Sequence, residues 1–170
     1  MGELFNLTNA NVKLYDGDPR NMDPTFGEAY FDKTRDTGYG GYYYDGRWEA
    51  VAETVIKRYN LDSKKKLLDV GCGKGFLLRD LQKKCQGITL RGLEVSQYAI
   101  DKAHGNTREV IDFGSAATLS YADNEFDCVT SINTFHFLTP EECQVALNEM
   151  VRVMKDPSKG FIQVDPFTDE

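Results

Sequence analysis

The sequence contains few of the residues that build metal sites and disulfide frameworks. Its 170 residues include four cysteines and two histidines, and no two cysteines form a Cys-x-x-Cys pair. No histidine neighbours a cysteine at zinc-ligand spacing, so we expect no metal site. Each cysteine lies among apolar residues or glycines, which predicts reduced thiols and a cytoplasmic location.

Long apolar runs and large basic clusters are missing as well. No stretch is apolar enough to predict a membrane span, and the polar start of the chain does not resemble a signal peptide, so we expect no membrane association. Lys and Arg number 20 against 27 Asp and Glu, giving a net charge of −7, and no basic cluster exceeds Lys64-Lys65-Lys66. We therefore expect no nucleic-acid partner, because such a partner presents a negatively charged backbone.

The remaining composition is that of one soluble domain. Apolar residues make up 41% and charged residues 28% of the chain, and 170 residues are enough to bury a core. Asp-Gly and Asp-Pro pairs before residue 27 mark turns and predict a loosely ordered arm. We divide the chain into an amino-terminal arm with an aromatic segment, residues 1–44, and a main domain, residues 45–170.

One stretch, residues 66–78, organises the main domain. A short apolar segment of β type precedes three alternating glycines, Gly71, Gly73 and Gly75, and an apolar pattern of helical spacing follows them. Strand, glycine turn and helix in this order are typical of a nucleotide-binding α/β unit. The glycines permit a sharp turn and a close approach of a ligand to the backbone.

An acidic residue stands where such a unit binds ribose. The next predicted strand, residues 88–95, contains Glu94, nineteen residues after Gly75. Its carboxylate is placed to accept hydrogen bonds from two ribose hydroxyls.

Two interpretations of this signature compete: a dinucleotide site, and a site for a ligand with an amino-acid ammonium or a sulfonium. A third possibility is a glycine turn that binds no ligand. A dinucleotide site expects Gly-x-Gly-x-x-Gly, whereas the glycines here alternate, and Asp69 precedes the first of them by two positions. A pyrophosphate would be repelled by that carboxylate, while an amino-acid ammonium or a sulfonium would be attracted.

The stretch resembles motif I of the class I S-adenosylmethionine-dependent methyltransferases, commonly Asp-x-Gly-x-Gly-x-Gly. The resemblance implies that the glycines let the methionine part of the cofactor lie against the backbone, that Asp69 orients its amino group, and that Glu94 binds the ribose. The cofactor-binding residues expected in this part of the chain are Asp69, Gly71, Cys72, Gly73, Glu94 and Val95.

Strands and helices alternate along the rest of the chain. Besides the stretch above, we expect helices at 45–59, 75–85, 96–103 and 140–154 and strands at 107–111, 126–132 and 161–165. Ser96 is the expected cap of the third helix, and Thr139 with Pro140 begins the fourth. The expected buried stripe of that helix is Cys143, Ala146, Leu147, Met150, Val151 and Met154. Together these elements predict an α/β fold, a three-layer Rossmann-like sandwich with a mostly parallel sheet of about five strands.

The resemblance extends over residues 45 to 165. After the third strand the family often has Gly-Asp-Ala, in which the Asp binds the adenine amino group, and this chain has Gly114-Ser115-Ala116. The resemblance implies that the Ser115 hydroxyl accepts this hydrogen bond and that the Ala116 N–H serves adenine N1. Asp112 is the alternative acceptor if the loop bends.

A second match follows the fourth strand, where Ser131-Ile-Asn-Thr-Phe-His-Phe137 fits the family's Ser-x-x-x-x-His pattern. It implies that Asn133 lies beside the methionine part of the cofactor and that His136 stands at the carboxyl edge of the sheet. His136 is a candidate general base there. The alternative is a histidine that packs between a loop and a helix.

The aromatic segment, residues 38–48, holds four tyrosines, a tryptophan and an arginine among four glycines. Glycines give hinge freedom and aromatic rings give a large contact area, as a lid requires. The alternative is an aromatic staple that packs the arm onto the sheet. As lid residues, Tyr42 and Arg47 are expected to contact the cofactor.

The function implied by the resemblance is methyl transfer from S-adenosylmethionine to a small-molecule acceptor, such as a sugar or another metabolite, by direct displacement, with S-adenosylhomocysteine as product. One alternative is a protein that binds the cofactor without catalysis. Another is an NAD-dependent oxidoreductase, against which the alternating glycines and the absence of a Tyr-x-x-x-Lys pair argue.

The chain departs from the family at its end. The family's sheet has seven strands, whereas this sequence stops just past the fifth. We therefore expect either a truncated product or a natural short form. In the short form the exposed fifth strand must be covered by a partner, for example in a homodimer, or by the amino-terminal arm.

Overall fold

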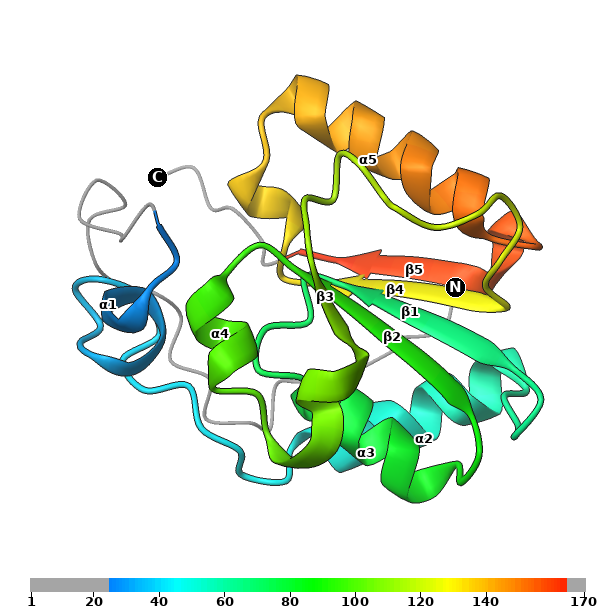
Figure 1. The fold of residues 1–170 in the computed structure, drawn as a ribbon, viewed down its shortest axis with the longest axis horizontal. Coiled ribbons are helices and arrows are strands. Elements are labelled where there is room, and N and C mark those ends of the chain that lie inside the picture. Colours follow the sequence, from blue (N-terminus) through cyan, green and yellow to red (C-terminus); the bar gives the residue numbers. More distant parts are fainter. Residues whose placement is uncertain (1–24, 165–170) are drawn as a thin grey trace.

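The computed structural model describes residues 25–164, and Figure 1 shows its fold. Most of the expected amino-terminal arm and the last residue of the expected fifth strand lie outside the described residues. The helices are α1 Glu28–Asp32, α2 Trp48–Tyr59, α3 Phe76–Lys84, α4 Gln97–Asp101 and α5 Pro140–Val153. The strands are β1 Lys66–Val70, β2 Thr89–Glu94, β3 Ile111–Phe113, β4 Cys128–Ile132 and β5 Gly160–Gln163. Short 3₁₀ helices are η3 Gly105–Val110, η4 Phe135–Phe137 and η5 Pro157–Lys159.

The strands form one parallel sheet in the order β3-β2-β1-β4-β5. This confirms the predicted fold class. The chain enters the sheet in the middle with β1, adds β2 and β3 on one side and then crosses to β4 and β5 on the other. The strand order therefore reverses between β1 and β4, and ligands of open α/β sheets bind at the carboxyl ends of the strands at such a point.

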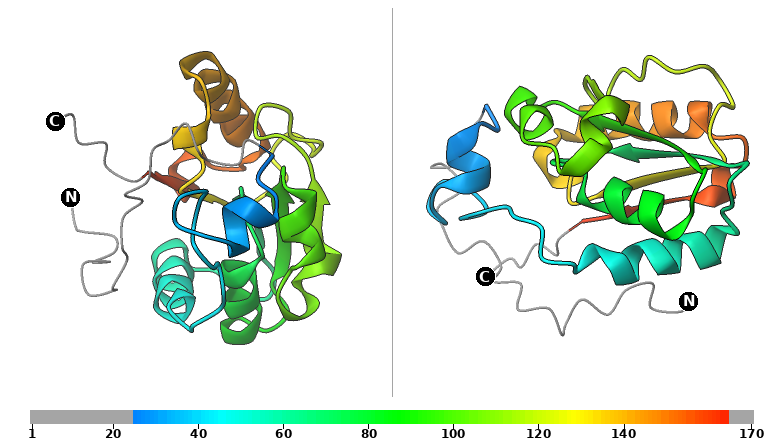
Figure 2. Two further views of the ribbon diagram at one scale, coloured as in Figure 1. Left: turned by 90° about the vertical axis from the view of Figure 1, so that its left-hand side faces the viewer. Right: turned by 60° about the horizontal axis from the view of Figure 1, so that its bottom comes forward.

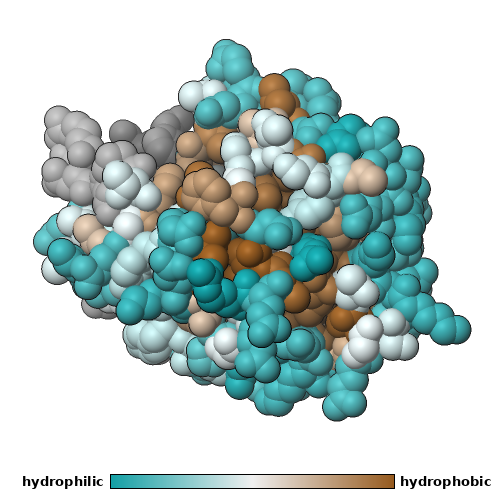
Figure 3. Space-filling model, in the orientation of Figure 1, coloured by the Kyte–Doolittle hydropathy of each residue, from teal (hydrophilic) through white to brown (hydrophobic). Residues whose placement is uncertain are grey.

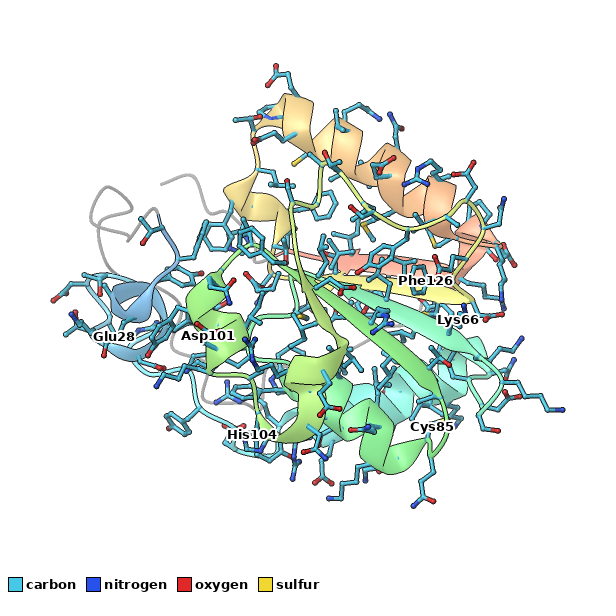
Figure 4. All side chains as sticks on the ribbon, viewed as in Figure 1. Glu28, Lys66, Cys85, Asp101, His104 and Phe126 are labelled. Carbon is cyan, nitrogen blue, oxygen red and sulfur yellow. The ribbon has the colours of Figure 1, made fainter. Side chains whose placement is uncertain are left out.

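Helices cover both faces of the sheet. In Figures 1 and 2, α2 and α3 lie on one face and α5 lies on the other. Leu67 and Leu78 belong to the core on the first side, and Phe126 and Met150 to the core on the second. Phe126 is fully buried between α5 and the sheet (Figure 4). Among the helices of residues 25–164, none has the length and apolarity needed to cross a membrane.

Local hydrogen bonds explain where the helices begin. Thr139 accepts a hydrogen bond from the N–H of Glu142 at 3.2 Å, and the Glu142 carboxylate accepts one from the N–H of Thr139 at 2.8 Å. This reciprocal pair, with Pro140 in the first turn, fixes the start of α5. Ser96 accepts a hydrogen bond from the N–H of Ala99 at 3.0 Å and caps α4. Both predicted caps are confirmed.

The predicted third strand, residues 107–111, is wrong in position. Residues 105–110 form η3, and β3 begins only at Ile111. The Thr107 side chain is buried, and its hydroxyl donates to the carbonyl of His104 at 2.8 Å. Such a local hydrogen bond stabilises a tight turn at the expense of a strand.

The predicted buried stripe of α5 is wrong in part. Ala146, Met150 and Val153 are buried against the sheet, whereas Leu147 and Val151 are 39% and 49% exposed. Residues 146, 150 and 153 share one helix face, and positions 147 and 151 lie about 100° further round the helix axis. The sheet contacts only a narrow stripe of this helix.

The segment before α2 crosses the carboxyl ends of the strands. Figures 1 and 2 show α1 beyond those ends, away from the two helical layers. Tyr30 and Phe31 of α1 are buried, and the chain folds back on them through hydrogen bonds from Tyr39 N to Tyr30 O at 2.8 Å and from Gly41 N to Phe31 O at 3.1 Å. We call residues 28–44 the lid segment.

Candidate functional site

The glycine loop after β1 is tied to β2. The N–H groups of Gly71 and Cys72 donate to the carbonyl of Leu93 at 2.7 and 3.1 Å. Gly71 has φ +76°, and a Cβ at this position would overlap the side chain of Thr134. Only glycine fits both the conformation and the space.

Glu94 ends β2 beside this loop. Its buried carboxylate accepts backbone hydrogen bonds from Gly73 at 2.7 Å, Val95 at 3.0 Å and Ser96 at 2.9 Å. Burial raises the pKa of Glu94, and the three N–H donors act in the opposite direction. A carboxylate offers about four lone-pair positions, so room is left for a ligand hydroxyl. The two halves of the sequence signature are thus brought together.

Asp69, near the end of β1, is a second buried carboxylate. Burial raises the pKa of Asp69 to about 7, a hydrogen bond from the Thr130 hydroxyl at 2.8 Å opposes this shift, and the charge of Glu94 adds to it. A cation bound near the two carboxylates would favour their charged forms. The ammonium of an amino-acid ligand suits such a position.

Side-chain hydroxyls replace backbone pairing where the β1–β4 ladder ends. The last backbone pair of these strands is Asp69 with Thr130. Beyond it, the carbonyl of Val70 accepts hydrogen bonds from the hydroxyls of Ser131 at 2.9 Å and Thr134 at 3.3 Å. Hydroxyl groups therefore satisfy a carbonyl that the strand ladder leaves unpaired.

Asn133, just after β4, carries the clearest unmet hydrogen-bonding capacity. Its N–H donates to the carbonyl of Gln163 at 2.8 Å, and its φ of +55° is unusual for a residue with a side chain. Its Oδ1 atom is buried and accepts no hydrogen bond from any described residue. Buried polar atoms normally have a partner, so this oxygen fits a donor on a ligand.

The expected adenine-binding residues lie at the end of β3. Ala116 is buried, whereas Ser115 is exposed and its hydroxyl accepts a hydrogen bond from the N–H of Ala117 at 3.2 Å. The alternative acceptor, Asp112, accepts a hydrogen bond from the Tyr121 hydroxyl at 2.9 Å. Both side chains keep lone pairs for an adenine amino group.

Two exposed apolar side chains stand next to these groups. Val95 is 50% and Phe113 64% exposed, and Phe113 is paired in the sheet with Glu94. Figure 3 shows apolar surface in the middle of the face on which β2 and β3 end. Sequence reasoning did not include Phe113 among the candidate residues. The predicted third strand ended at residue 111, whereas β3 extends to Phe113.

Different tyrosines of the aromatic segment agree with different interpretations, Tyr42 with a lid and Tyr44 with a staple. The Tyr42 ring lies over the glycine loop, because a Cβ on Gly73 would be 3.3 Å from it. The Tyr44 hydroxyl donates to Asp80 at 2.9 Å and fastens the segment to α3. Tyr43 is 73% exposed.

The structure also gives the surroundings of the three remaining candidate residues, Arg47, His136 and Cys72. Arg47 forms an ion pair of 2.5 Å with Asp45 just before α2. His136 is exposed in η4, with its ring 4.0 Å from that of Phe137. Cys72 is buried, burial raises the pKa of its thiol, and it contributes its N–H to the loop. Within residues 25–164, no group of three His, Cys, Asp or Glu side chains is arranged to hold a metal ion.

A family model described as a methyltransferase domain matches residues 68–162, more than half of the chain. The chain belongs to this methyltransferase domain family. S-Adenosylmethionine is the family's cofactor, and the buried Oδ1 of Asn133 and the two buried carboxylates, Asp69 and Glu94, fit its ammonium and hydroxyl groups.

Several curated methyltransferases resemble this domain. Methyltransferase GfsG of Streptomyces halstedii is 32% identical over 114 residues, which are 63% of this chain and 40% of that protein. Norajmaline N-methyltransferase of Rauvolfia serpentina is 37% identical over 95 residues, or 52% and 32% of the two chains. The tRNA N(3)-methylcytidine methyltransferase trm140 of Schizosaccharomyces pombe is 25% identical over 158 residues, or 84% and 51%. The methyltransferase domain described here thus spans at most about half the length of these relatives.

A solved structure has the same fold. The crystal structure of a candidate S-adenosylmethionine-dependent methyltransferase from Methanococcus maripaludis matches with a TM-score of 0.59 at 24% identity, covering 68% of this chain and 54% of that one. At this identity the match supports the fold of the methyltransferase domain alone.

Proposed function

We propose that this chain binds S-adenosylmethionine at the carboxyl ends of β1, β2 and β4 and transfers its methyl group to a small-molecule acceptor. The observation that carries the proposal is the hydrogen bond of 2.7 Å between Gly73 N and the buried carboxylate of Glu94. It joins the glycine loop and the acidic residue into one site next to the point where the strand order reverses.

Each residue of the site then has a task. Glu94 accepts a hydrogen bond from the ribose, and Gly71 and Gly73 leave the backbone open to the methionine part. Asp69 and the Oδ1 atom of Asn133 bind the ammonium group. The proposed adenine contacts are Val95, Phe113, Ala116 and either Ser115 or Asp112.

The remaining residues act on the acceptor and on water. When bound, the cofactor supplies a methyl group on a positively charged sulfur, and the acceptor's lone pair forms the new bond to carbon as the carbon–sulfur bond breaks. Because that group is already activated, the chain mainly holds the two reactants in position. Tyr30 and Tyr42 cover the site and exclude water. His136 is the proposed general base, which accepts a proton from the acceptor, and Arg47 stays a proposed lid residue.

The acceptor class rests on two supporting observations. The net charge of −7 disfavours a phosphate backbone, and the name of one relative specifies norajmaline, a small molecule, as acceptor. The name of another relative specifies a tRNA, so the acceptor has to be tested by class. A cytoplasmic location and a homodimer are further proposals, and sedimentation tests the second.

Isothermal titration with S-adenosylmethionine and with NAD tests the cofactor. We expect binding of the first and not the second, with the affinity lowered at least tenfold in Glu94→Ala. Glu109→Ala is the matched control, because Glu109 is an exposed glutamate outside the site. Equal affinity in both variants, or binding of NAD alone, would remove the basis of the proposal.

Turnover distinguishes the proposal from binding without catalysis. Release of S-adenosylhomocysteine is measured with pools of small amines, hydroxy acids and sugars, and separately with tRNA. We expect release with a small-molecule pool. Release with tRNA alone would replace the acceptor class. Binding without release from any pool would favour the alternative, a cofactor-binding protein without catalysis.

A further inference from the structure

Lys74 occupies an unusual position inside the glycine loop. It stands between Gly73 and Gly75, yet its side chain is turned inward, and the residue is only 6% exposed. Lysine is almost never buried unless its ammonium is paired. The partners of this ammonium therefore indicate what the residue does.

Both hydrogen-bond acceptors of Lys74 come from the lid segment. Its Nζ atom lies 2.5 Å from Oδ1 of Asp32, the last residue of α1, and 2.9 Å from the carbonyl oxygen of Tyr42. The rings of Phe31, Tyr42 and Tyr98 each lie 5.9 Å from the same nitrogen. Three aromatic faces and two oxygens thus enclose the charge.

Asp32 is the centre of this contact. Besides Lys74, it accepts a hydrogen bond at 2.8 Å from the hydroxyl of Tyr98 in α4. Burial by itself would raise the pKa of Asp32, but the hydrogen bonds from Lys74 and Tyr98 hold it below its ordinary value. The carboxylate is therefore charged at neutral pH and joins three parts of the fold: α1, the glycine loop and α4.

The contact also sets the place of the Tyr42 ring. Lys74 holds the carbonyl of Tyr42, and the ring of Tyr42 rests against Gly73, whose N–H is bound to Glu94. Gly40 and Gly41, just before it, have φ values of +71° and +108°, which give this part of the lid segment its sharp turn. Movement of the lid segment away from the loop therefore requires the Lys74 contacts to break.

We propose that Lys74 and Asp32 are positioning residues that latch the lid segment over the cofactor and limit the rate at which the cofactor leaves. This inference rests on the proposed function for the identity of the ligand. The latch itself is a contact within the chain. Removal of either partner leaves the other charge without its counter-ion, so each single substitution opens the latch.

The first experiment measures dissociation of S-adenosylhomocysteine by stopped flow, with the sole tryptophan, Trp48, as the fluorescent reporter. The variants are Asp32→Asn, Lys74→Met and the double variant. We expect the dissociation rate to rise at least tenfold in each single variant, with little further change in the double variant, because both remove the same contact. Lys74→Arg, which keeps the charge, should dissociate more slowly than Lys74→Met, because part of the contact with Asp32 is retained.

Lys83→Met is the matched control. Lys83 is a lysine of α3 whose ion pair with Glu49 at 2.9 Å is exposed and distant from the loop. Circular dichroism and melting temperature establish that each variant is folded. Dissociation rates equal to that of Lys83→Met, or additive effects of the two latch substitutions, would overturn the inference.

A second experiment needs no cofactor. Trypsin cleaves after Lys33 and Arg35, which lie in the lid segment, so the cleavage rate reports its opening. We expect faster cleavage at these bonds in Asp32→Asn and Lys74→Met than in the native chain. If the native chain bound no S-adenosylhomocysteine, the proposed function would fail, and the cleavage rates would still decide the latch. Unchanged cleavage in both variants would overturn it.

Discussion

The Thr130 hydroxyl donates a hydrogen bond of 2.8 Å to Oδ1 of Asp69, joining β4 to β1 in the middle of the sheet. Burial is the largest cause of the raised pKa of Asp69, and Thr130 is its hydrogen-bond donor. A neutral carboxyl at this position is therefore more compatible with the fold than a charged one.

The pH dependence of stability follows from this pair. The pKa of Asp69 is about 7 in the folded chain and 3.8 ordinarily, so between these values the folded state binds the proton more tightly than the unfolded state. The contribution of Asp69 to the free energy of unfolding should therefore fall as pH rises from about 4 to 7, by an amount on the order of a few kcal/mol. Urea unfolding as a function of pH measures it. Asp69→Asn should flatten this part of the curve, and an unchanged slope would contradict the assignment.

Substitution of Gly71 and of Gly46 by alanine should differ in cost, because the space around the two glycines differs. Gly71 and Gly46 have φ values of +76° and +86°, but a Cβ at Gly46 would have no neighbour within 4 Å, whereas one at Gly71 would overlap Thr134. Gly46→Ala should therefore cost only the backbone strain, about 1–2 kcal/mol. Gly71→Ala should cost clearly more and weaken cofactor binding. Equal losses in chemical unfolding would show that Thr134 moves aside.

The third prediction concerns Arg152, which holds the loop before β4 at residues 119–123. Its guanidinium donates to Glu149, to Asp123 and to the carbonyls of Leu119 and Tyr121, at distances of 2.7 to 2.9 Å. Arg152→Lys keeps the charge but loses the planar fork, so we expect the melting temperature to fall by several degrees and hydrogen exchange of residues 115–123 to rise.

The control for that loop is Arg108→Met. The Arg108 ion pair with Asp101 is exposed on both sides, with exposed fractions of 54% and 53%. Isolated surface pairs contribute little, so this variant should melt almost as the native chain does. A similar loss in both variants would mean that Arg152 has no special part in holding the loop.

The corrected face of α5 gives a fourth prediction. Met150 is buried at 2% exposure and Leu147 is 39% exposed, although the two stand three positions apart. Met150→Ala should destabilise the domain by about 2–5 kcal/mol because it opens a cavity in the core. Leu147→Ala should cost less than about 1 kcal/mol in the same urea titration. Equally large losses in the two variants would instead support the stripe predicted from the sequence, in which both residues are buried.

Sequence reasoning predicts well those parts of the fold that are determined by interactions within a short segment of the chain. The glycines before α3, the caps Ser96 and Thr139 and the alternation of strands and helices depend on neighbours a few positions away. Thr107 shows the limit of such reasoning, because its hydroxyl bonds to His104 and turns a segment of strand-like composition into η3. The stripe of α5 fails for another reason, since the width of the contact is set by the sheet and not by the helix.

The site divides in the same way. Glu94 and the glycine loop were predicted together because the spacing of the two motifs is a local property. Lys74 was not singled out, because its partner Asp32 is 42 positions distant and carries no motif of its own. Asn133 was predicted from a resemblance, whereas its unpaired Oδ1 atom is visible only when the surrounding chain is folded.

The Val70 carbonyl, bound by Ser131 and Thr134, lies just beyond the last backbone pair of β1 and β4. A strand ladder that simply stopped there would leave this carbonyl without a donor. At this junction two side-chain hydroxyls take the part that backbone amides have within the ladder. The pairing of β1 with β4 can therefore end at Asp69 and Thr130 without leaving a backbone acceptor unsatisfied at Val70.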